Sequence, residues 1–170
     1  MTEQIYSQSA RKILQNKKQI EDSLEIKLYI KSGIVILEGH PENEIVALEV
    51  IEAINLGFSV SQALDLKRED FIFEKILIKS IARRRNLVQV RGRVIGEERK
   101  VLRTIEYLTD CDIVLHGNTV GIIGARENVE NASYALKRII AGSEHANMYA
   151  WLEMQQARKN KAFKTSFFYL

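Results

Sequence analysis

The second half of the chain alternates between two periodicities of apolar residues. Residues 112–116 alternate apolar and polar side chains, Gly117-Asn118 is a turn pair, and 119–123 is again β-prone, so a β-hairpin is predicted here. Apolar residues then recur at helical spacing over 126–140. Antiparallel strands combined with helices indicate an α+β fold.

Upstream of this hairpin, a strand is predicted over 71–81 and two helices over 87–95 and 101–108, separated by a loop that contains Gly96. The predicted order is strand, helix, glycine loop, helix, strand, strand, helix. An apolar stripe over 144–158 predicts one more helix towards the C-terminus.

The first part of the chain shows the same order with weaker signals. A helix is predicted over 10–24, a hairpin over 26–38 and a long helix over 41–55. The opening strand would have to lie in 2–7, and one or two helical turns are expected over 59–66. Each part is thus expected to form a three-stranded antiparallel sheet packed on helices.

The two parts repeat each other at an offset of 85 residues, without a gap, from Ile20 to Gly57. Nine of the thirty-eight aligned positions are identical, and the apolar positions of the strands coincide as well. The identical residues of the first copy are Ile20, Glu21, Val35, Gly39, Glu42, Asn43, Ala47, Ile54 and Gly57. This agreement favours two copies of one module over chance similarity.

Composition sets the class of protein. The chain has 170 residues, 46% hydrophobic and 28% charged, enough for one mid-sized domain or two small ones. Its single cysteine, Cys111, excludes an internal disulfide and fits a reducing compartment. No run approaches the roughly 18 apolar residues of a membrane span, and no secretory signal is seen. We expect a cytoplasmic protein, or a nuclear or nucleolar one if the chain is eukaryotic.

The formal net charge is only +3, but the positive excess is concentrated in one segment. Residues 83–103 hold eight basic and two acidic side chains, a net charge of +6, whereas 1–82 carry −3 and 104–170 are balanced. The basic residues are Arg83, Arg84, Arg85, Arg91, Arg93, Arg99, Lys100 and Arg103. Concentrated positive charge is typical of a surface that binds a polyanion. A solvated basic helix face is the alternative.

Gly96 stands at the mouth of a predicted helix, inside this basic segment. The start of a helix leaves backbone N–H groups unpaired, and a glycine allows close approach because it has no Cβ. The loop is therefore a candidate binding site for a nucleic-acid backbone.

The residues around this loop resemble a type I KH RNA-binding domain. That pattern is an apolar pair, a Gly-x-x-Gly loop, and then apolar, threonine and strand positions at fixed spacing. Val94 and Ile95 match the apolar pair, and Gly96 matches the first glycine of the loop. Thr109 precedes the strand that contains Ile113. Such a domain has the order β-α-α-β-β-α.

Longer runs resemble the archaeal and eukaryotic KH proteins of small-ribosomal-subunit assembly, the Dim/partner-of-Nob and KRR-type proteins. Residues 91–96 resemble their approach to the loop, 106–111 and 117–120 resemble the KRR type, and 142–149 resembles the archaeal Dim type.

The resemblance implies three parts. Residues 1–68 would form a degenerate KH module, 69–143 an RNA-binding KH module, and 144–170 a C-terminal helix with a basic and aromatic tail.

The sequence departs from the family pattern in both copies. In the second copy, Arg99 stands where the second loop glycine is expected. In the first copy, the aligned positions 11–14 read Arg-Lys-Ile-Leu and contain no glycine. We therefore expect the first copy to be a structural or protein-binding module, although its surface lysines are an alternative contact for phosphates.

By this resemblance, the loop of the second copy would clamp about four nucleotides of single-stranded RNA. The residues expected to contact RNA are Arg91, Arg93, Val94, Ile95, Gly96, Arg99, Lys100 and Arg103. Arg99 would pair with a phosphate and share a helix face with Arg103. Val94 and Ile95 are candidates for an apolar floor beneath the bases, or plain core residues. Gly96→Asp is expected to weaken binding without unfolding the protein.

The resemblance implies a non-enzymatic protein that binds single-stranded small-subunit rRNA near its 3′ end during ribosome assembly. Its expected partners are rRNA and a Nob-type endonuclease or a translation initiation factor. The alternative is a KH-based protein-interaction scaffold with little RNA binding, which the missing glycine and Glu97-Glu98 favour. No cofactor and no metal are expected, since Cys111 and His116 lack metal-ligand spacing and no catalytic motif occurs.

Overall fold

The computed structural model describes residues 3–83 and 86–167, with side chains over 5–83 and 86–163. The chain divides into two compact units, Met1–Phe73 and Glu74–Leu170. Each unit builds a three-stranded antiparallel sheet, in the order β1-β3-β2 in the first and β4-β6-β5 in the second. The predicted α+β fold with two such sheets packed on helices is confirmed.

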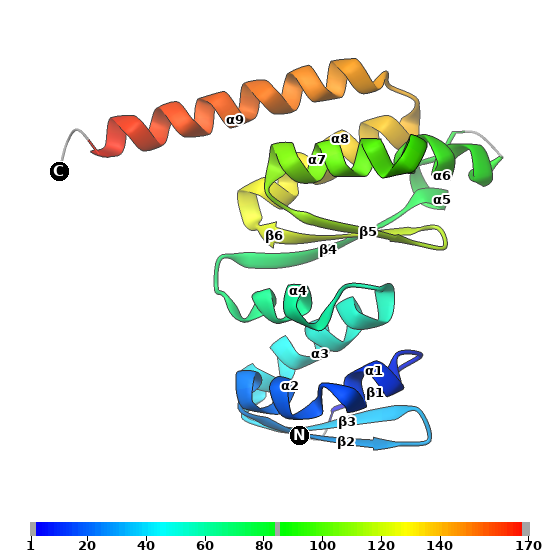
Figure 1. Cartoon of the computed structure of the whole chain (residues 1–170), viewed down its shortest axis with the longest axis vertical. Helices are drawn as coiled ribbons and strands as arrows, with labels where there is room; N and C mark the ends of the chain where they lie inside the picture. The colour runs from blue at the N-terminus through cyan, green and yellow to red at the C-terminus, as the bar shows by residue number, and fades with distance from the viewer. Residues whose placement is uncertain (1–2, 84–85, 168–170) are drawn as a thin grey trace. The chain divides into compact units, whose positions relative to one another are not determined.

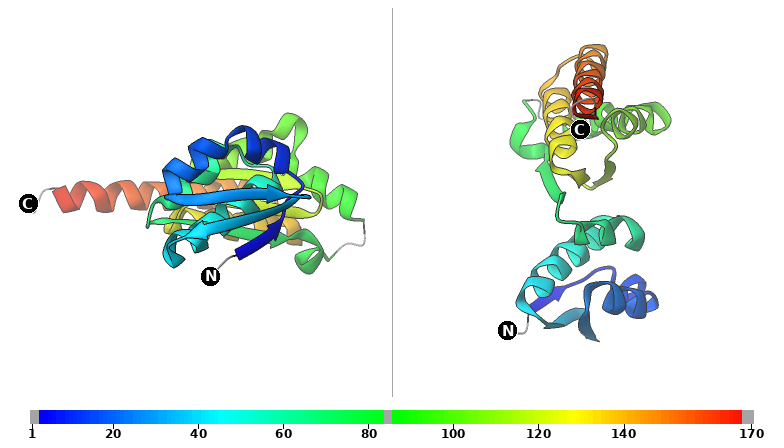
Figure 2. Two further views of the ribbon diagram at one scale, coloured as in Figure 1. Left: turned by 90° about the horizontal axis from the view of Figure 1, so that it is seen from below. Right: turned by 90° about the vertical axis from the view of Figure 1, so that its left-hand side faces the viewer.

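The first unit places its helices on one face of its sheet (Figure 1). Its strands are β1 (Glu3–Tyr6), β2 (Ile26–Lys31) and β3 (Ile34–Gly39), and its helices are α1 (Ala10–Gln15), α2 (Lys17–Leu24), α3 (Pro41–Leu56), α4 (Val60–Leu64) and the 3-10 turn η1 (Asp65–Lys67). Figure 2 (left) shows the three strands side by side. The inward residues Leu28, Val35 and Leu37 are fully buried against helix residues such as Ile20 and Ile54, as alternation on a half-buried sheet requires.

The second unit repeats this arrangement and adds a long C-terminal helix. Its strands are β4 (Phe71–Leu77), which begins in the last residues of the first unit, β5 (Asp112–His116) and β6 (Thr119–Ala125). Its helices are α5 (Ile78–Ile81), α6 (Leu87–Ile95), α7 (Lys100–Thr109), α8 (Arg126–Ala141) and α9 (His145–Phe167), with the 3-10 turn η2 (Glu97–Arg99). Helices α7 and α8 cover the sheet, and α9 packs on both of them (Figures 1 and 2).

Four predicted element boundaries need correction. The helix expected over 10–24 is broken at Asn16, and the strand expected over 71–81 ends at Leu77, where α5 begins. Strand β6 does not stop at Gly124 but continues through it to Ala125, and α9 extends nine residues beyond the predicted Arg158. The predicted helix over 87–95 and strand over 112–116 are confirmed without change.

The 85-residue repeat is visible in equivalent structural details. Glu21 Oε1 accepts a hydrogen bond from Leu28 N at 2.8 Å, and its counterpart Glu106 Oε1 accepts one from Ile113 N at 3.1 Å. A Cβ on Gly39 would lie 2.9 Å from Ile26 Cγ2, and a Cβ on its counterpart Gly124 would lie 2.8 Å from Cys111 Sγ. The identical residues are thus those that join the second helix to the hairpin and let the two strands pack closely.

Among the described helices, none is long and apolar enough to cross a membrane.

Candidate nucleic-acid interface

The predicted glycine loop is a real break between two helices. Helix α6 ends at Ile95, Gly96 follows with φ 72° and ψ 171°, and α7 begins only at Lys100. Between them, Glu98 (φ 49°) and Arg99 (φ 63°) also take left-handed conformations, which are costly for residues with a side chain. The loop is therefore strained at two of its four positions, whereas Gly96 takes its positive φ without strain.

Gly96 is required by the fold itself. Its φ and ψ lie in a region that is essentially restricted to glycine. A Cβ here would lie 2.8 Å from Val101 N and 2.4 Å from Val101 Cγ2. Contrary to the expectation from the sequence, we therefore expect Gly96→Asp to destabilise the second unit, because any side chain would push against the first turn of α7.

Arg99 is engaged inside the second unit. Its Nη2 donates hydrogen bonds to Glu106 Oε1 at 3.3 Å and to the carbonyl oxygen of Ile113 at 3.2 Å. It precedes α7 in a left-handed conformation, so it does not share a helical face with Arg103 as the sequence predicted. Its guanidinium ties the loop to α7 and β5, which leaves fewer donors for a phosphate.

Arg93 also has an internal role. Its Nη2 donates to the carbonyl oxygens of Gly142, at 3.2 Å, and of Ser143, and its own carbonyl oxygen lies 2.9 Å from His145 Nε2. Arg93 thus fastens the last turn of α6 to the junction of α8 and α9. Arg91 is half-buried, and its Nε is buried with no hydrogen-bond partner among the described residues.

The two apolar candidates differ in exposure. Val94 is fully buried in the core and offers no surface to a base, whereas Ile95 is half-buried beside the loop. Core packing, the alternative interpretation, therefore holds for Val94. Arg84 and Arg85 of the basic segment, and residues 168–170 of the predicted tail, lie outside the described residues.

Lys100 and Arg103 are the cations that the fold presents to solvent. Both side chains are exposed, and neither forms an ion pair with any residue that the structure describes. They line an open hollow of about 570 Å³ beside the loop, together with Glu97, Glu98, Thr104 and Tyr107. Lys100, Arg103, Thr104 and Tyr107 follow one face of α7 because they are spaced three and four residues apart. The hollow carries two cations and two carboxylates.

Tyr107 is the residue that sequence reasoning missed. It is 79% exposed on α7, the highest exposure among the large apolar and aromatic residues that the structure describes. The helical spacing from Arg103 and Thr104 could have placed it beside the candidate cations. An aromatic ring next to cations is the combination that single-stranded nucleic acids use for stacking and charge neutralisation.

Glu106 links the loop to the sheet. Partial burial raises the pKa of this carboxyl above its usual value, while the hydrogen bond from Ile113 N–H and the Arg99 guanidinium act in the opposite direction. Burial also raises the pKa of Cys111 to about 11, so this thiol is protonated and inert at neutral pH.

The corresponding junction of the first unit has no loop. Residues 11–14, which the repeat aligns with Gly96–Arg99, lie inside α1, and Ile13 is fully buried. Helices α1 and α2 are joined by Asn16 alone, which has φ −113° and whose Nδ2 donates to Lys12 O at 2.8 Å. The sequence alignment therefore misplaced this junction, although its finding that no glycine loop is present agrees with the structure.

Within residues 3–83 and 86–167, no three His, Cys, Asp or Glu side chains gather in a way that could hold a metal ion.

Comparison with known proteins places the chain in a family. Residues 72–157 match the model of the second KH domain of PNO1 proteins, described as a eukaryotic type KH-domain (KH-domain type I). The chain is 35% identical over 153 residues to the KH domain-containing protein MJ0443 of Methanocaldococcus jannaschii, with 86% of this chain and 67% of that protein covered. It is 32% identical over 143 residues to the RNA-binding protein pno1 of Drosophila pseudoobscura pseudoobscura, with 79% and 60% covered.

The chain thus spans about 60% of the length of this pno1 relative and about two thirds of the archaeal one. It is also similar to a chain in the crystal structure of the complex of a/eIF2alpha, aDim2p and rRNA from Pyrococcus horikoshii. That similarity has a TM-score of 0.83 and 29% identity, and covers 93% of this chain and 95% of that one. The glycine loop between α6 and α7, the hairpin and the matches in sequence and structure agree, and the chain belongs to the PNO1/Dim2 family of KH-domain proteins.

Proposed function

We propose that this protein binds single-stranded small-subunit rRNA near its 3′ end during ribosome assembly and has no catalytic activity of its own. The observation that carries the proposal is the similarity over nearly the whole chain to a chain of the complex of aDim2p, a/eIF2alpha and rRNA. The loop between α6 and α7, with Lys100 and Arg103 exposed beside it, supplies a physical site for that function.

The architecture proposed for this function is two tandem type I KH modules. Residues 1–68 form a module without a glycine loop, 69–143 form the RNA-binding module, and 144–170 add the C-terminal helix and tail. The equivalent hydrogen bonds of Glu21 and Glu106 support a common origin of the two modules. The unbroken helix α1 at positions 11–14 supports the loss of RNA binding from the first.

At the loop, backbone geometry and charge act together. Gly96 allows the chain to turn sharply between α6 and α7, and Lys100, the first residue of α7, is exposed, so the positive end of the α7 dipole lies at the surface. Lys100 and Arg103 add two exposed positive charges on the first turn of that helix. Because the guanidinium of Arg99 contacts Glu106 and Ile113, Lys100 and Arg103 carry the larger part of phosphate binding.

The experiment that tests this function is titration of a labelled single-stranded oligonucleotide of 3′-terminal small-subunit rRNA sequence with the full chain at several salt concentrations. Binding is expected to weaken steeply with salt, with a slope of about −0.7 for each phosphate contacted. A double-stranded RNA of the same sequence is the control and should bind more weakly. Absence of binding at low salt would overturn the proposal.

A second candidate function, a protein-interaction scaffold, is favoured by the exposed carboxylates of Glu97 and Glu98 at the tip of the loop. Carboxylates repel phosphates and attract basic protein surfaces. For a partner, a translation initiation factor of the eIF2alpha type is the best supported, since such a factor occurs in the Pyrococcus horikoshii complex. Binding to such a factor without any retention of RNA would favour the scaffold.

A further inference from the structure

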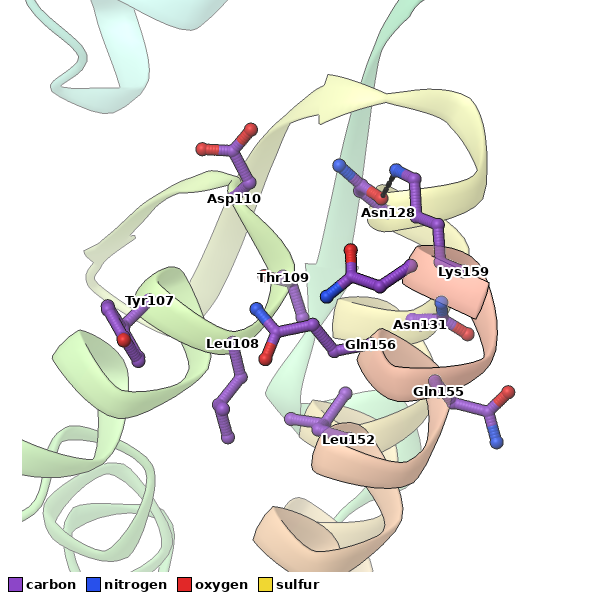
Figure 3. A pocket seen from close by; sticks show the side chains of 11 residues that line it. Tyr107, Leu108, Thr109, Asp110, Asn128, Asn131, Leu152, Gln155, Gln156 and Lys159 are labelled. Carbon is purple, nitrogen blue, oxygen red and sulfur yellow. Dashed lines mark hydrogen bonds between the residues drawn. The ribbon is translucent and has the colours of Figure 1, made fainter. Parts of the chain in front are cut away.

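A second hollow, which we call the amide pocket, lies where the end of α7, the start of α8 and the middle of α9 meet (Figure 3). Its volume is about 320 Å³, at the lower end of the range of small-molecule sites. Five of its lining side chains are carboxamides: Asn128, Asn131, Gln155, Gln156 and Asn160. So many amides in one hollow indicate a site built for hydrogen bonding rather than for charge.

Asn128 is the buried anchor of the amide pocket. Its side chain is 8% exposed, and Lys159 Nζ donates to its Oδ1 at 2.7 Å (Figure 3). An ammonium group can only donate, so this contact fixes the amide oxygen towards Lys159 and turns Nδ2 the other way. Within the part of the chain that the structure describes, Nδ2 of Asn128 donates to no other residue. This donor therefore remains open to an acceptor group of a ligand that enters the amide pocket.

The other carboxamides are also available. Figure 3 shows the Gln156 side chain reaching from α9 towards Thr109 on α7. Among the described residues, neither Gln156 nor Asn131 has a hydrogen-bond partner for its side chain. A carboxamide offers a donor and an acceptor in one plane, the same arrangement that the edge of a nucleobase presents.

Charge and position distinguish the possible ligands. The amide pocket contains one carboxylate, Asp110, and one ammonium group, Lys159, which is engaged by Asn128, so it does not attract a phosphate. Tyr107 lines both the amide pocket and the hollow beside the loop. From Lys100 to Tyr107 the helix rises about 10 Å, roughly the length of three stacked nucleotides at about 3.4 Å each.

We propose that the amide pocket binds one unstacked base of the RNA strand whose backbone lies at the loop, with the ring of Tyr107 as a stacking platform at its rim. Asn128 Nδ2 and the Gln156 carboxamide hydrogen-bond to the edge of the base, and Leu152 and Leu108 contact its apolar surface. This inference rests on the proposed function for the source of the base, but the chemistry of the amide pocket is independent of the loop.

The test is NMR titration of the full chain, labelled with 15N, by the four ribonucleosides, which carry no phosphate. We expect the side-chain NH2 signals of Asn128, Asn131 and Gln156 to shift on addition of at least one nucleoside. Tyr107→Ala and Gln156→Ala should each weaken this binding at least about fivefold, since the first removes the stacking platform and the second a hydrogen-bonding carboxamide. Asn147→Ala, an exposed amide on the same helix outside the amide pocket, is the matched control and should change nothing.

Titration with N-methylacetamide, a model of the peptide backbone, distinguishes a pocket that binds a base from a pocket that binds a protein segment. If it shifts the same amide signals as strongly as every nucleoside does, the amide pocket binds peptide groups and the proposal is overturned. Absence of any shift with nucleosides also overturns it. Nucleoside shifts together with no retention of RNA at low salt would overturn the proposed function, and with it the RNA strand as the source of the base, and would leave the amide pocket as a site for a free base or nucleoside.

Discussion

The two units join their paired helices in different ways although the surrounding scaffold is the same. In the first unit, Asn16 alone connects α1 to α2, with a negative φ of −113°. In the second, four residues connect α6 to α7, and three of them have positive φ. Strain of this kind persists where the surrounding structure imposes it, and it concentrates at functional sites. The difference therefore separates a simple connection between two helices from one whose backbone conformation the surrounding structure imposes.

The cationic side chains near the two junctions also differ, because hydrogen bonds and ion pairs with described residues occupy two of them in the first unit, whereas two in the second have none. Lys12 Nζ donates to the carbonyl oxygen of Phe58 at 2.7 Å, and Lys17 Nζ lies 3.7 Å from Glu21 Oε1. These lysines of the first unit are occupied by internal contacts. Lys100 and Arg103 of the second unit have no such contact with a described residue, so their charge is available to a ligand.

The largest expected effect comes from a side chain at Gly96. Gly96→Ala should destabilise the second unit by about 2–3 kcal/mol, because a Cβ would meet the backbone of Val101 and the conformation strongly disfavours residues with a side chain. Urea denaturation followed by circular dichroism measures the loss.

The matched variant in the first unit is Asn16→Ala, which removes one partly exposed hydrogen bond and should cost about 1 kcal/mol or less. Equal losses at the two positions would show that the glycine loop is no more constrained than the simple connection.

Charge reversal tests the availability of the cations. We expect Lys100→Glu combined with Arg103→Glu to weaken binding of single-stranded RNA about tenfold to a hundredfold at low salt, and to lower the salt slope by about 1.4 because two phosphate contacts are lost. Fluorescence anisotropy with a labelled oligonucleotide gives both values.

Lys18→Glu, an exposed lysine on α2, changes one charge in the first unit and should reduce RNA affinity far less. A comparable loss from Lys18→Glu would mean that the first unit contributes to RNA binding after all.

Much of this comparison could be predicted from the sequence. The periodicity of apolar residues placed α6 and β5 at their observed bounds, and the repeat identified the glutamates and glycines that serve equivalent roles. Local patterns succeed there because each element buries one continuous face.

The features that the sequence did not predict depend mainly on contacts between residues that are distant along the chain. Arg93 and Arg99 looked like solvent-facing cations, but each donates to carbonyl oxygens that are distant in sequence, Gly142 and Ile113 among them. The break at Asn16 was missed because apolar residues on both sides keep a helical spacing. Tyr107 was overlooked because the sequence does not show that its ring is exposed, although its helical spacing from Arg103 was readable.

Replacement of Arg99 tests whether this residue stabilises the loop or binds a phosphate of the ligand. Arg99→Gly restores the glycine expected by the family pattern and relieves a positive φ, while it removes the contacts to Glu106 and Ile113. Since these effects oppose each other, stability should change by less than about 1 kcal/mol, and RNA affinity by less than about threefold. A loss of affinity as large as that from reversal of Lys100 and Arg103 would show that Arg99 holds a phosphate directly.

The smallest expected effect concerns Glu106, which shares with Glu21 the hydrogen bond to a strand and additionally contacts Arg99. Burial raises the pKa of Glu106 in the folded protein, so the folded state holds this proton more tightly than the unfolded state does. Its contribution to stability is then greatest below the unfolded pKa and declines as the pH rises through the folded one.

The variant Glu106→Gln tests this sign, because it keeps an oxygen for Ile113 N–H but cannot ionise. The free energy of unfolding of the wild type minus that of the variant should therefore decrease as the pH rises from below the usual carboxyl range to above it, as measured by urea denaturation at each pH. A difference that instead grows with pH would mean that the Arg99 ion pair outweighs the cost of burying the carboxylate, and that the loop is held mainly by charge.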